Sequence, residues 1–156
     1  MAIAPTVLHF LEEKGIHYEL VAHPRTYSSH DSAVAAHVAD DHLATAVVLR
    51  DDAGYLQFVI PASQWWKLHG VRDAFARPLD FAEEDELDGI YEDCASGAVP
   101  AVGQAYGVET VLDNSLTTLA NVFFEAGDHE HLVHVSGDQF AELMQGLRRG
   151  YFTEEN

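Results

Sequence analysis

Apolar residues recur at helical spacing at both ends of the chain. The N-terminal set predicts a helix over about residues 4–14, with its buried face at Ile3, Val7, Phe10 and Leu11. Gly15 follows at the left-handed position that commonly ends a helix. The C-terminal set predicts a second helix from Ser136 onward, with an apolar stripe at Phe140, Leu143, Met144 and Leu147.

Extended apolar segments fill the centre of the chain. Two of them, 44–51 and 55–60, flank the turn "DAG" and predict a hairpin of largely buried strands. Further strands are expected at 17–23, 108–113, 121–127 and 131–136. Helices are expected at 28–38, 63–75 and 81–91, and the tail 150–156 is expected to be loosely held.

Strands and helices are mixed in this order without strict alternation. This predicts a single α/β domain over residues 1–156, with a mixed sheet or small β-barrel and helices packed outside it. Two helix starts carry capping-box spacing, Ser28 with Asp31 and Ser136 with Gln139.

The charge balance limits the partners. Asp and Glu number 26 against 8 Lys and Arg, a formal net charge of −18. A basic nucleic-acid-binding face is therefore not expected. An acidic surface and a salt-adapted source explain the excess equally well.

Other global features predict a cytoplasmic protein without a membrane span. No apolar run approaches the roughly 20 residues that a membrane helix needs. The N-terminus lacks the basic segment of a signal peptide, and Cys94 is the single cysteine. Its acidic neighbours would raise the pKa of the thiol, so an inert cysteine is expected.

The stretch "SGAVPAVGQAYGV", residues 96–108, is uncharged in an otherwise acidic chain. It holds three glycines and one proline between residues 97 and 107. One interpretation is a tight buried turn. The other is a cradle of backbone N–H groups around an anionic or developing negative charge.

The histidines near residue 130 raise the question of a metal. His129 and His131 are expected on one face of a strand and His134 on the other. An H-x-H pair could supply two ligands, but no third ligand is marked by spacing. We therefore expect no metal and no cofactor, and interpret these histidines as a polar strand end or a substrate contact.

Four stretches in this order resemble the YbaK/ProX-type aminoacyl-tRNA deacylases, which are related to editing domains of prolyl-tRNA synthetases. They are "KGIHYELVAHPRTYSSHDSA", "ATAVVLRDDAGYLQFVIPAS", "DCASGAVPAVGQAYGVETVLDNSL" and "FFEAGDHEHLVHVSGDQFAELM". The resemblance covers nearly the whole chain. It implies hydrolysis of the ester that joins a wrong amino acid to the 3′ end of a tRNA.

The resemblance also implies site residues. In the family, a G-x-x-x-P loop places backbone groups around the ester and the terminal ribose. Here Gly97, Ala98 and His129 would be catalytic. The residues that would bind substrate are Thr45, Val99, Pro100, Ala101 and Asp113.

Two departures from the family pattern affect this interpretation. Thr45 stands where the family usually has a lysine, and the usual final proline of the loop is Ala101, with Pro100 one position earlier. Two hypotheses follow: a free-standing deacylase that binds the tRNA 3′ end weakly, or a catalytically lapsed member that binds a ligand or a protein.

Overall fold

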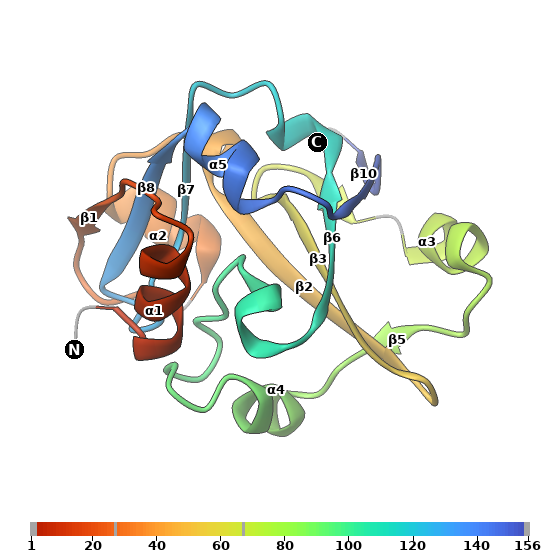
Figure 1. Ribbon diagram of the computed structural model, residues 1–156. Helices are drawn as coiled ribbons and strands as arrows, with labels where there is room; N and C mark the ends of the chain where they lie inside the picture. Colours follow the sequence, from red (N-terminus) through yellow and green to blue (C-terminus); the bar gives the residue numbers. More distant parts are fainter. Residues whose placement is uncertain (1–2, 27, 67, 155–156) are drawn as a thin grey trace.

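A five-stranded mixed sheet forms the centre of the molecule. The computed structural model describes residues 3–26, 28–66 and 68–154 (Figure 1). The strands lie in the order β5 (Asp80–Phe81), β2 (Ala44–Asp51), β3 (Gly54–Pro61), β6 (Glu109–Asp113) and β9 (Arg148–Gly150). The β2–β3 hairpin is antiparallel, as predicted, while β3–β6 and β6–β9 are parallel.

A second sheet lies beside the start of β2. It contains β1 (Glu19–Ala22), β8 (His131–Ser136) and β7 (Asn121–Glu125), all antiparallel. A parallel bridge from Leu43 to Phe123 connects the two sheets. A third pair joins β4 (Trp65–Trp66) to β10 (Thr153–Glu154).

The mixed α/β class is confirmed, but the barrel part of the prediction is wrong. The described strands form three open sheets. The edge strands β5 and β9 are only two and three residues long, and the two larger sheets meet through an isolated bridge rather than a continuous ladder. Barrel closure requires continuous pairing around the ring.

Five α-helices cover these sheets: α1 (Pro5–Glu13), α2 (Ser29–Ala35), α3 (Leu68–Phe75), α4 (Glu84–Ile90) and α5 (Gly137–Leu143). Figure 1 shows α1 and α2 near the β1–β8–β7 sheet and α3 near β5. Short 3-10 turns occur at Asp40–His42, Gly103–Tyr106 and Asn114–Leu116. None of the helices in the described ranges is long and apolar enough to cross a membrane.

The predicted amphipathic faces pack together in the main core. Val7 and Leu11 of α1 are fully buried, as are Phe140 and Met144 at the other end of the chain. Both predicted N-caps form. The Ser28 hydroxyl accepts from Asp31 N–H at 3.1 Å, and the Ser136 hydroxyl accepts from Gln139 N–H at 3.2 Å.

Two predicted boundaries are wrong. The helix expected at 63–75 begins only at Leu68, because Trp65 and Trp66 pair with β10. Within the tail expected to be loose, Gly150 ends β9 and Thr153–Glu154 form β10, while residues 155 and 156 lie outside the described ranges. Phe152, between these two strands, is buried against Phe58, which secures this end of the chain.

Candidate active site

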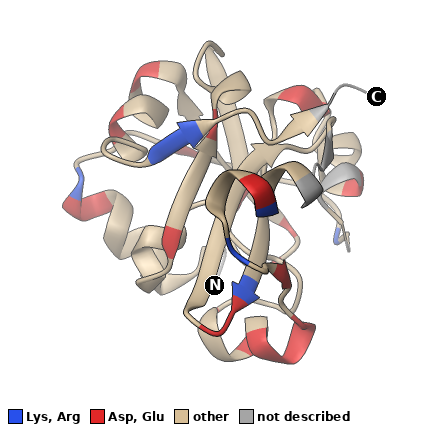
Figure 2. Cartoon of the chain, turned by 90° about the vertical axis from the view of Figure 1, so that its right-hand side faces the viewer, with Lys and Arg blue, Asp and Glu red and all other residues tan. Residues whose placement is uncertain are grey.

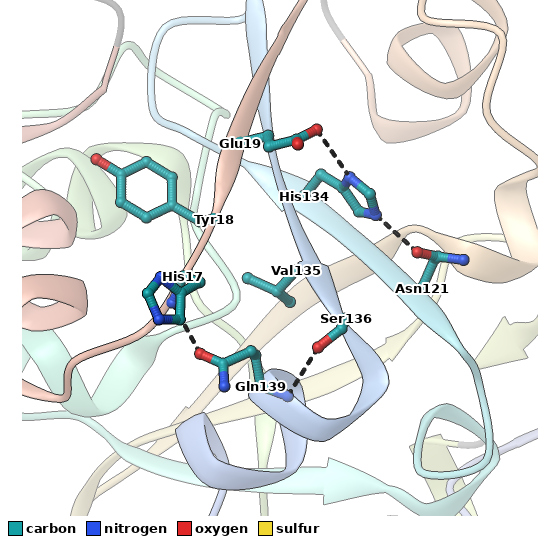
Figure 3. A pocket seen from close by; sticks show the side chains of 8 residues that line it. All are labelled: His17, Tyr18, Glu19, Asn121, His134, Val135, Ser136 and Gln139. Atoms are coloured by element: carbon teal, nitrogen blue, oxygen red, sulfur yellow. Dashed lines mark hydrogen bonds and ion pairs between the residues drawn. The ribbon is translucent and has the colours of Figure 1, made fainter.

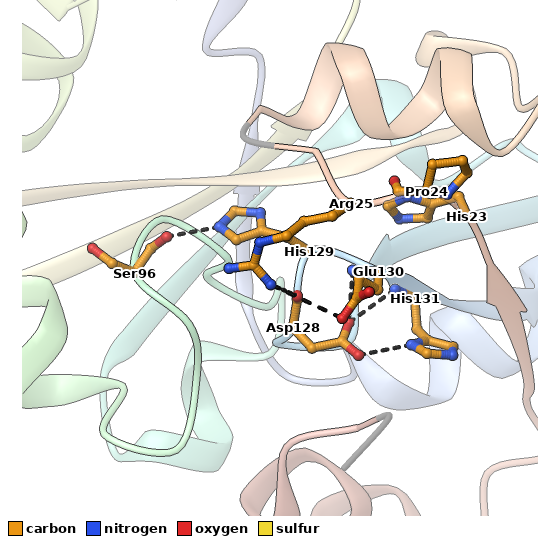
Figure 4. A network of polar contacts seen from close by, with 8 residues as sticks. All are labelled: His23, Pro24, Arg25, Ser96, Asp128, His129, Glu130 and His131. Atoms are coloured by element: carbon orange, nitrogen blue, oxygen red, sulfur yellow. Dashed lines mark hydrogen bonds and ion pairs between the residues drawn. The ribbon is translucent and has the colours of Figure 1, made fainter.

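The glycine loop and His129 meet, although they are more than thirty residues apart in sequence. His129 Nε2 lies 2.7 Å from the carbonyl oxygen of Ser96 (Figure 4). A carbonyl oxygen can only accept, so Nε2 donates this hydrogen bond. A Cβ added at Gly97 would lie 3.6 Å from the same nitrogen. The two elements that the sequence analysis singled out for catalysis are therefore in contact.

This hydrogen bond also fixes the direction of the next N–H group. In a trans peptide, the C=O and N–H of one unit point to opposite sides. Since the Ser96 carbonyl points to His129, the Gly97 N–H points away from the ring. Gly97 is exposed, and its N–H makes no hydrogen bond to any other described residue. The geometry presents one free backbone donor to a ligand.

Gly97 is needed for this conformation. Its φ of +83° lies in the left-handed region that residues with a Cβ rarely adopt. His129 also has a positive φ, of 62°. Two left-handed residues facing each other mark a locally constrained site.

The rest of the loop is fixed by hydrogen bonds to neighbouring residues. The Ala98 N–H donates to Ala95 C=O at 3.0 Å, so it closes the turn. Pro100 C=O accepts from the fully buried Gln57 side chain at 3.0 Å, and the Tyr91 hydroxyl donates to the same amide. Burial raises the pKa of the Tyr91 hydroxyl, which keeps it a donor. Buried hydrogen bonds of this kind give the loop a defined position.

The remaining loop residues differ in exposure. Ala98 and Ala101 are fully buried and Pro100 is buried, whereas Val99 is half-buried and packs near Tyr91. A ligand on the outer surface would meet Gly97 first. The others shape the loop from within.

The turn that carries His129 is built around Asp128. One oxygen of its carboxylate accepts from the N–H groups of Glu130 and His131, at 2.9 and 2.8 Å, and the other lies 2.7 Å from His131 Nδ1. This turn ends before β8, which begins at His131. The prediction that His129 and His131 share one strand face is therefore wrong. Within the described ranges, no three His, Cys, Asp or Glu side chains are grouped closely enough to hold a metal.

Arg25 is the cation nearest this turn. Its Nη1 donates to Asp128 C=O at 3.3 Å and lies 3.9 Å from a Glu130 carboxylate oxygen (Figure 4). A cavity of about 440 Å³ adjoins the turn and is lined by Arg25, Ala95, Gly127 and Asp128, among others. The candidate site therefore has an open side next to the loop.

Thr45 approaches this region from the other sheet. It is the second residue of β2, half-buried, and two residues beyond Leu43. Glu125 is likewise two residues beyond Phe123, the partner of Leu43 in the parallel bridge. Side chains two residues apart on an extended strand share a face, so the Thr45 side chain lies on the same face of β2 as Leu43, and the bridge brings the start of β2 next to β7.

Asp113 lies at the far end of β6 and is fully buried. One carboxylate oxygen accepts from the N–H and hydroxyl of Ser115, and the other from the N–H of Phe152 and the hydroxyl of Thr153. These bonds connect the end of β6 to residues 152–153 near the end of the described chain. The role of Asp113 in substrate binding stays a prediction, while its structural contacts are evident.

A buried polar cluster behind His129 was missed by the sequence analysis. Glu125 is 4% exposed, and its carboxylate accepts from the hydroxyl of the fully buried Ser32 at 2.8 Å. Thr26 and His23 complete the cluster. A glutamate at the end of an apolar strand, in "NVFFEAG", is the one signal that could have pointed to it.

Cys94 behaves as predicted. Burial raises the pKa of its thiol to about 11, and Asp93 adds to this effect, while a contact with the Tyr106 hydroxyl opposes it. The thiolate is therefore scarce at neutral pH. Cys94 is not a candidate nucleophile.

A separate cavity of about 300 Å³ lies between β1, β8 and α5 (Figure 3). Its polar groups are largely bonded to one another or to the chain. His134 Nε2 lies 2.8 Å from Asn121 Oδ1, and the Gln139 side chain accepts from His17 N–H at 2.7 Å. None of the predicted site residues lines it.

The fold and the loop together define a mixed α/β protein with a candidate site that presents one free backbone donor. A family model for the aminoacyl-tRNA editing domain matches residues 23–143. The chain therefore belongs to the aminoacyl-tRNA editing domain family, which confirms the resemblance noted from its motifs. No curated protein matches the sequence significantly.

Solved structures share this fold. A candidate trans-editing enzyme for prolyl-tRNA synthetase superposes with a TM-score of 0.82 at 22% identity, covering 97% of this chain and 96% of that one. The hypothetical protein APE2540 gives 0.82 at 19% identity, with 96% and 99% covered. A signal transduction protein candidate from Marinobacter aquaeolei VT8 gives 0.77 at 20% identity. That match covers 96% of this chain but only 30% of the longer protein. At these identities the likeness establishes the fold alone.

Proposed function

We propose that this protein hydrolyses the ester bond of a mischarged aminoacyl-tRNA in trans. The observation that carries the proposal is the outward-facing Gly97 N–H, fixed by the hydrogen bond from His129 to Ser96. A backbone donor in this position suits the oxyanion that develops when water attacks the ester carbonyl. Family membership supports an aminoacyl-tRNA as the substrate class.

The chemistry asks little of side chains. Water attacks the ester carbon, the carbonyl oxygen takes on negative charge, and the bond to the ribose 3′ or 2′ oxygen then breaks. The ribose oxygen leaves with one proton of the attacking water, the other proton is released to solvent, and the amino acid leaves as its carboxylate. An aminoacyl ester is already activated, so positioning of water and one or two donors supply much of the effect.

Each site residue has a role in this proposal. Gly97 donates to the oxyanion, and His129 holds the loop at the reacting centre. Val99, which is half-buried, forms the wall beside the ester, the buried Pro100 and Ala101 support the loop from within, and Ala98 closes the turn through its N–H bond to Ala95. Asp113 contributes indirectly, because its hydrogen bonds fix the end of β6, the strand that follows the glycine loop.

A catalytically lapsed binding module is the second candidate. The observation that favours it is Thr45, which brings no positive charge where the family usually has a lysine. A panel of mischarged tRNAs separates the two candidates. Deacylation of at least one of them above a protein blank supports the enzyme, and binding without turnover supports the module.

His129→Ala is expected to lower kcat on the best substrate about tenfold. The variant loses the hydrogen bond that orients Ser96 C=O, while the Gln57 bond to Pro100 still holds the far end of the loop. Misplacement of a donor by about 1 Å can cost up to ~10² in rate. Steady-state deacylation kinetics provide the measurement.

His134→Ala is the matched control for that variant. His134 stacks on Phe123 with ring centroids 4.4 Å apart, in the separate cavity. The His134→Ala variant should keep its kcat within twofold of the wild-type value. Equal losses in both variants would contradict a special role for His129.

Binding to tRNA is expected to depend only weakly on salt. The few Lys and Arg residues are scattered among many acidic ones (Figure 2). Arg25, Arg50, Arg72 and Arg77 all lie within 4 Å of a carboxylate oxygen, at 3.9, 2.8, 3.8 and 2.7 Å. Few counterions would therefore be released from the tRNA on binding.

Titrations of a tRNA acceptor minihelix between about 50 and 200 mM salt test this expectation. Affinity should change little, or rise slightly as repulsion is screened. A steep loss of affinity with salt would contradict it and indicate a basic face.

A further inference from the structure

Glu125 is a buried acid with an incomplete set of partners. Its Oε1 accepts from Ser32 Oγ at 2.8 Å, whereas its Oε2 is buried without a hydrogen-bond partner among the described residues. Burial raises the pKa of this carboxyl. The Ser32 hydrogen bond and the imidazoles of His129 and His23 oppose that shift, and the Asp128 carboxylate reinforces it. A buried acceptor left unmatched is costly and calls for a reason.

A chain of hydrogen bonds joins this acid to the glycine loop. Ser32 donates its single hydroxyl proton to Glu125, so at the 2.6 Å contact between Thr26 Oγ1 and Ser32 Oγ the threonine must donate. The Thr26 N–H donates to His129 C=O at 3.1 Å. His129 then bonds Ser96 at 2.7 Å. Thr26 therefore donates on both sides, through its hydroxyl toward Ser32 and Glu125 and through its N–H toward His129, and so links the acid to the loop.

We propose that Glu125 is a positioning residue for His129, and that its carboxylate holds the turn that orients the Gly97 N–H toward the substrate. This role rests on the proposed function. The charge acts in two ways. It fixes the direction of the Ser32–Thr26 hydrogen bond, and it lies close enough to the imidazoles of His129 and His23 to interact with them electrostatically.

An uncharged hydrogen-bond acceptor at position 125 would serve the fold with a smaller desolvation cost than the Glu125 carboxylate. Glutamine has nearly the same shape, can accept from Ser32 through its amide oxygen, and carries no charge to desolvate.

In the wild-type protein the folded state binds the Glu125 proton more tightly than the unfolded state does. Its stability should therefore fall as pH rises from the ordinary carboxyl value of 4.5 through the raised pKa. Glu125→Gln should lack this loss.

The decisive experiment compares Glu125→Gln with the wild type on the best mischarged tRNA. The variant should match or exceed the wild-type melting temperature at pH 7 and yet lose at least tenfold in kcat, with KM within twofold. The wild-type kcat should rise with pH as Glu125 ionises, and this rise should be absent from the variant. A residue of purely structural value would not combine these results.

Ser32→Ala provides a second test of the chain, and Glu142→Gln, an exposed glutamate on α5, is the control. Ser32→Ala should lower kcat severalfold, and Glu142→Gln should leave it unchanged. If the wild type is active and both Glu125→Gln and Ser32→Ala keep wild-type kcat at every pH, the positioning role is wrong while the deacylase function stands.

A readout without turnover separates this inference from the proposed function. Amide signals of Ser96 and Gly97 in ¹H–¹⁵N NMR spectra should shift in Glu125→Gln and in Ser32→Ala, but not in Glu142→Gln. If no mischarged tRNA is hydrolysed, the proposed function fails, and shifted signals still support the connection from Glu125 to the loop. Unchanged signals overturn it.

Discussion

Gly97→Val is expected to lower kcat/KM on the best mischarged tRNA by at least a hundredfold. A β-branched side chain at a φ of +83° is strongly disfavoured. The new Cβ would lie 3.6 Å from His129 Nε2, so its methyl groups would press on the ring or turn the Ser96–Gly97 peptide away. Loss of one oxyanion donor typically costs ~10²–10³ in rate.

The chain offers a close control in Gly146→Val. Gly146 has a φ of +84°, is exposed, and would have no atom within 4 Å of an added Cβ. Both variants pay the same backbone cost, on the order of 1–2 kcal/mol, in the free energy of unfolding. Thermal melts should therefore show similar losses of stability, while deacylation should fall only for Gly97→Val.

Two results would count against the role of Gly97. Full activity in Gly97→Val would show that its N–H is not used. Unfolding of Gly97→Val, with Gly146→Val intact, would show that the loop serves the fold and not the reaction.

Local sequence was sufficient for the long elements of this fold. The β2–β3 hairpin and the α5 stripe are each defined by one continuous local pattern. Their caps and turns agree with the pattern, as at Ser136 and Gln139.

The short strands could not be predicted in this way. β4 and β10 are two residues each, and Trp66 pairs with Thr153 across most of the chain. Two residues carry no periodicity, so only the tertiary partner specifies the strand. The open form of the sheets has the same origin, since edge pairing depends on contacts distant in sequence.

The residues of the candidate site differ in the same way, since local sequence identifies some of them and not others. Gly97 and His129 were found because they lie in motifs of a known family. Glu125 and Ser32 lie in two of the quoted stretches but were not singled out, because 93 positions separate them and no local pattern marks them as partners. A buried hydrogen bond between distant polar residues leaves no mark on local spacing.

Thr45→Lys is expected to raise kcat/KM on mischarged tRNA about tenfold from a weak native level. The Leu43–Phe123 bridge brings the start of β2 next to β7, which ends at Glu125, whose Oε2 lacks a hydrogen-bond partner in the described chain. A lysine ammonium there gains a carboxylate partner and reaches several ångströms beyond threonine. It can hold a ribose or phosphate oxygen beside the Gly97 N–H, and recovered positioning of about 1 Å is worth up to ~10² in rate.

Thr45→Met separates charge from length, because it extends the side chain without an ammonium group. It should leave kcat/KM near the wild-type level, and equal gains in both variants would contradict the electrostatic explanation. The ammonium group introduced by Thr45→Lys should also lower the raised pKa of Glu125, which a carboxyl ¹³C titration measures. Adding Glu125→Gln to Thr45→Lys should remove most of the gain, since the new cation then loses its partner.

If neither the wild type nor Thr45→Lys deacylates any tRNA above the blank, while both are folded, the protein is not an editing enzyme. The site then supports the binding-module function, with the Gly97 loop intact and the family lysine replaced by Thr45.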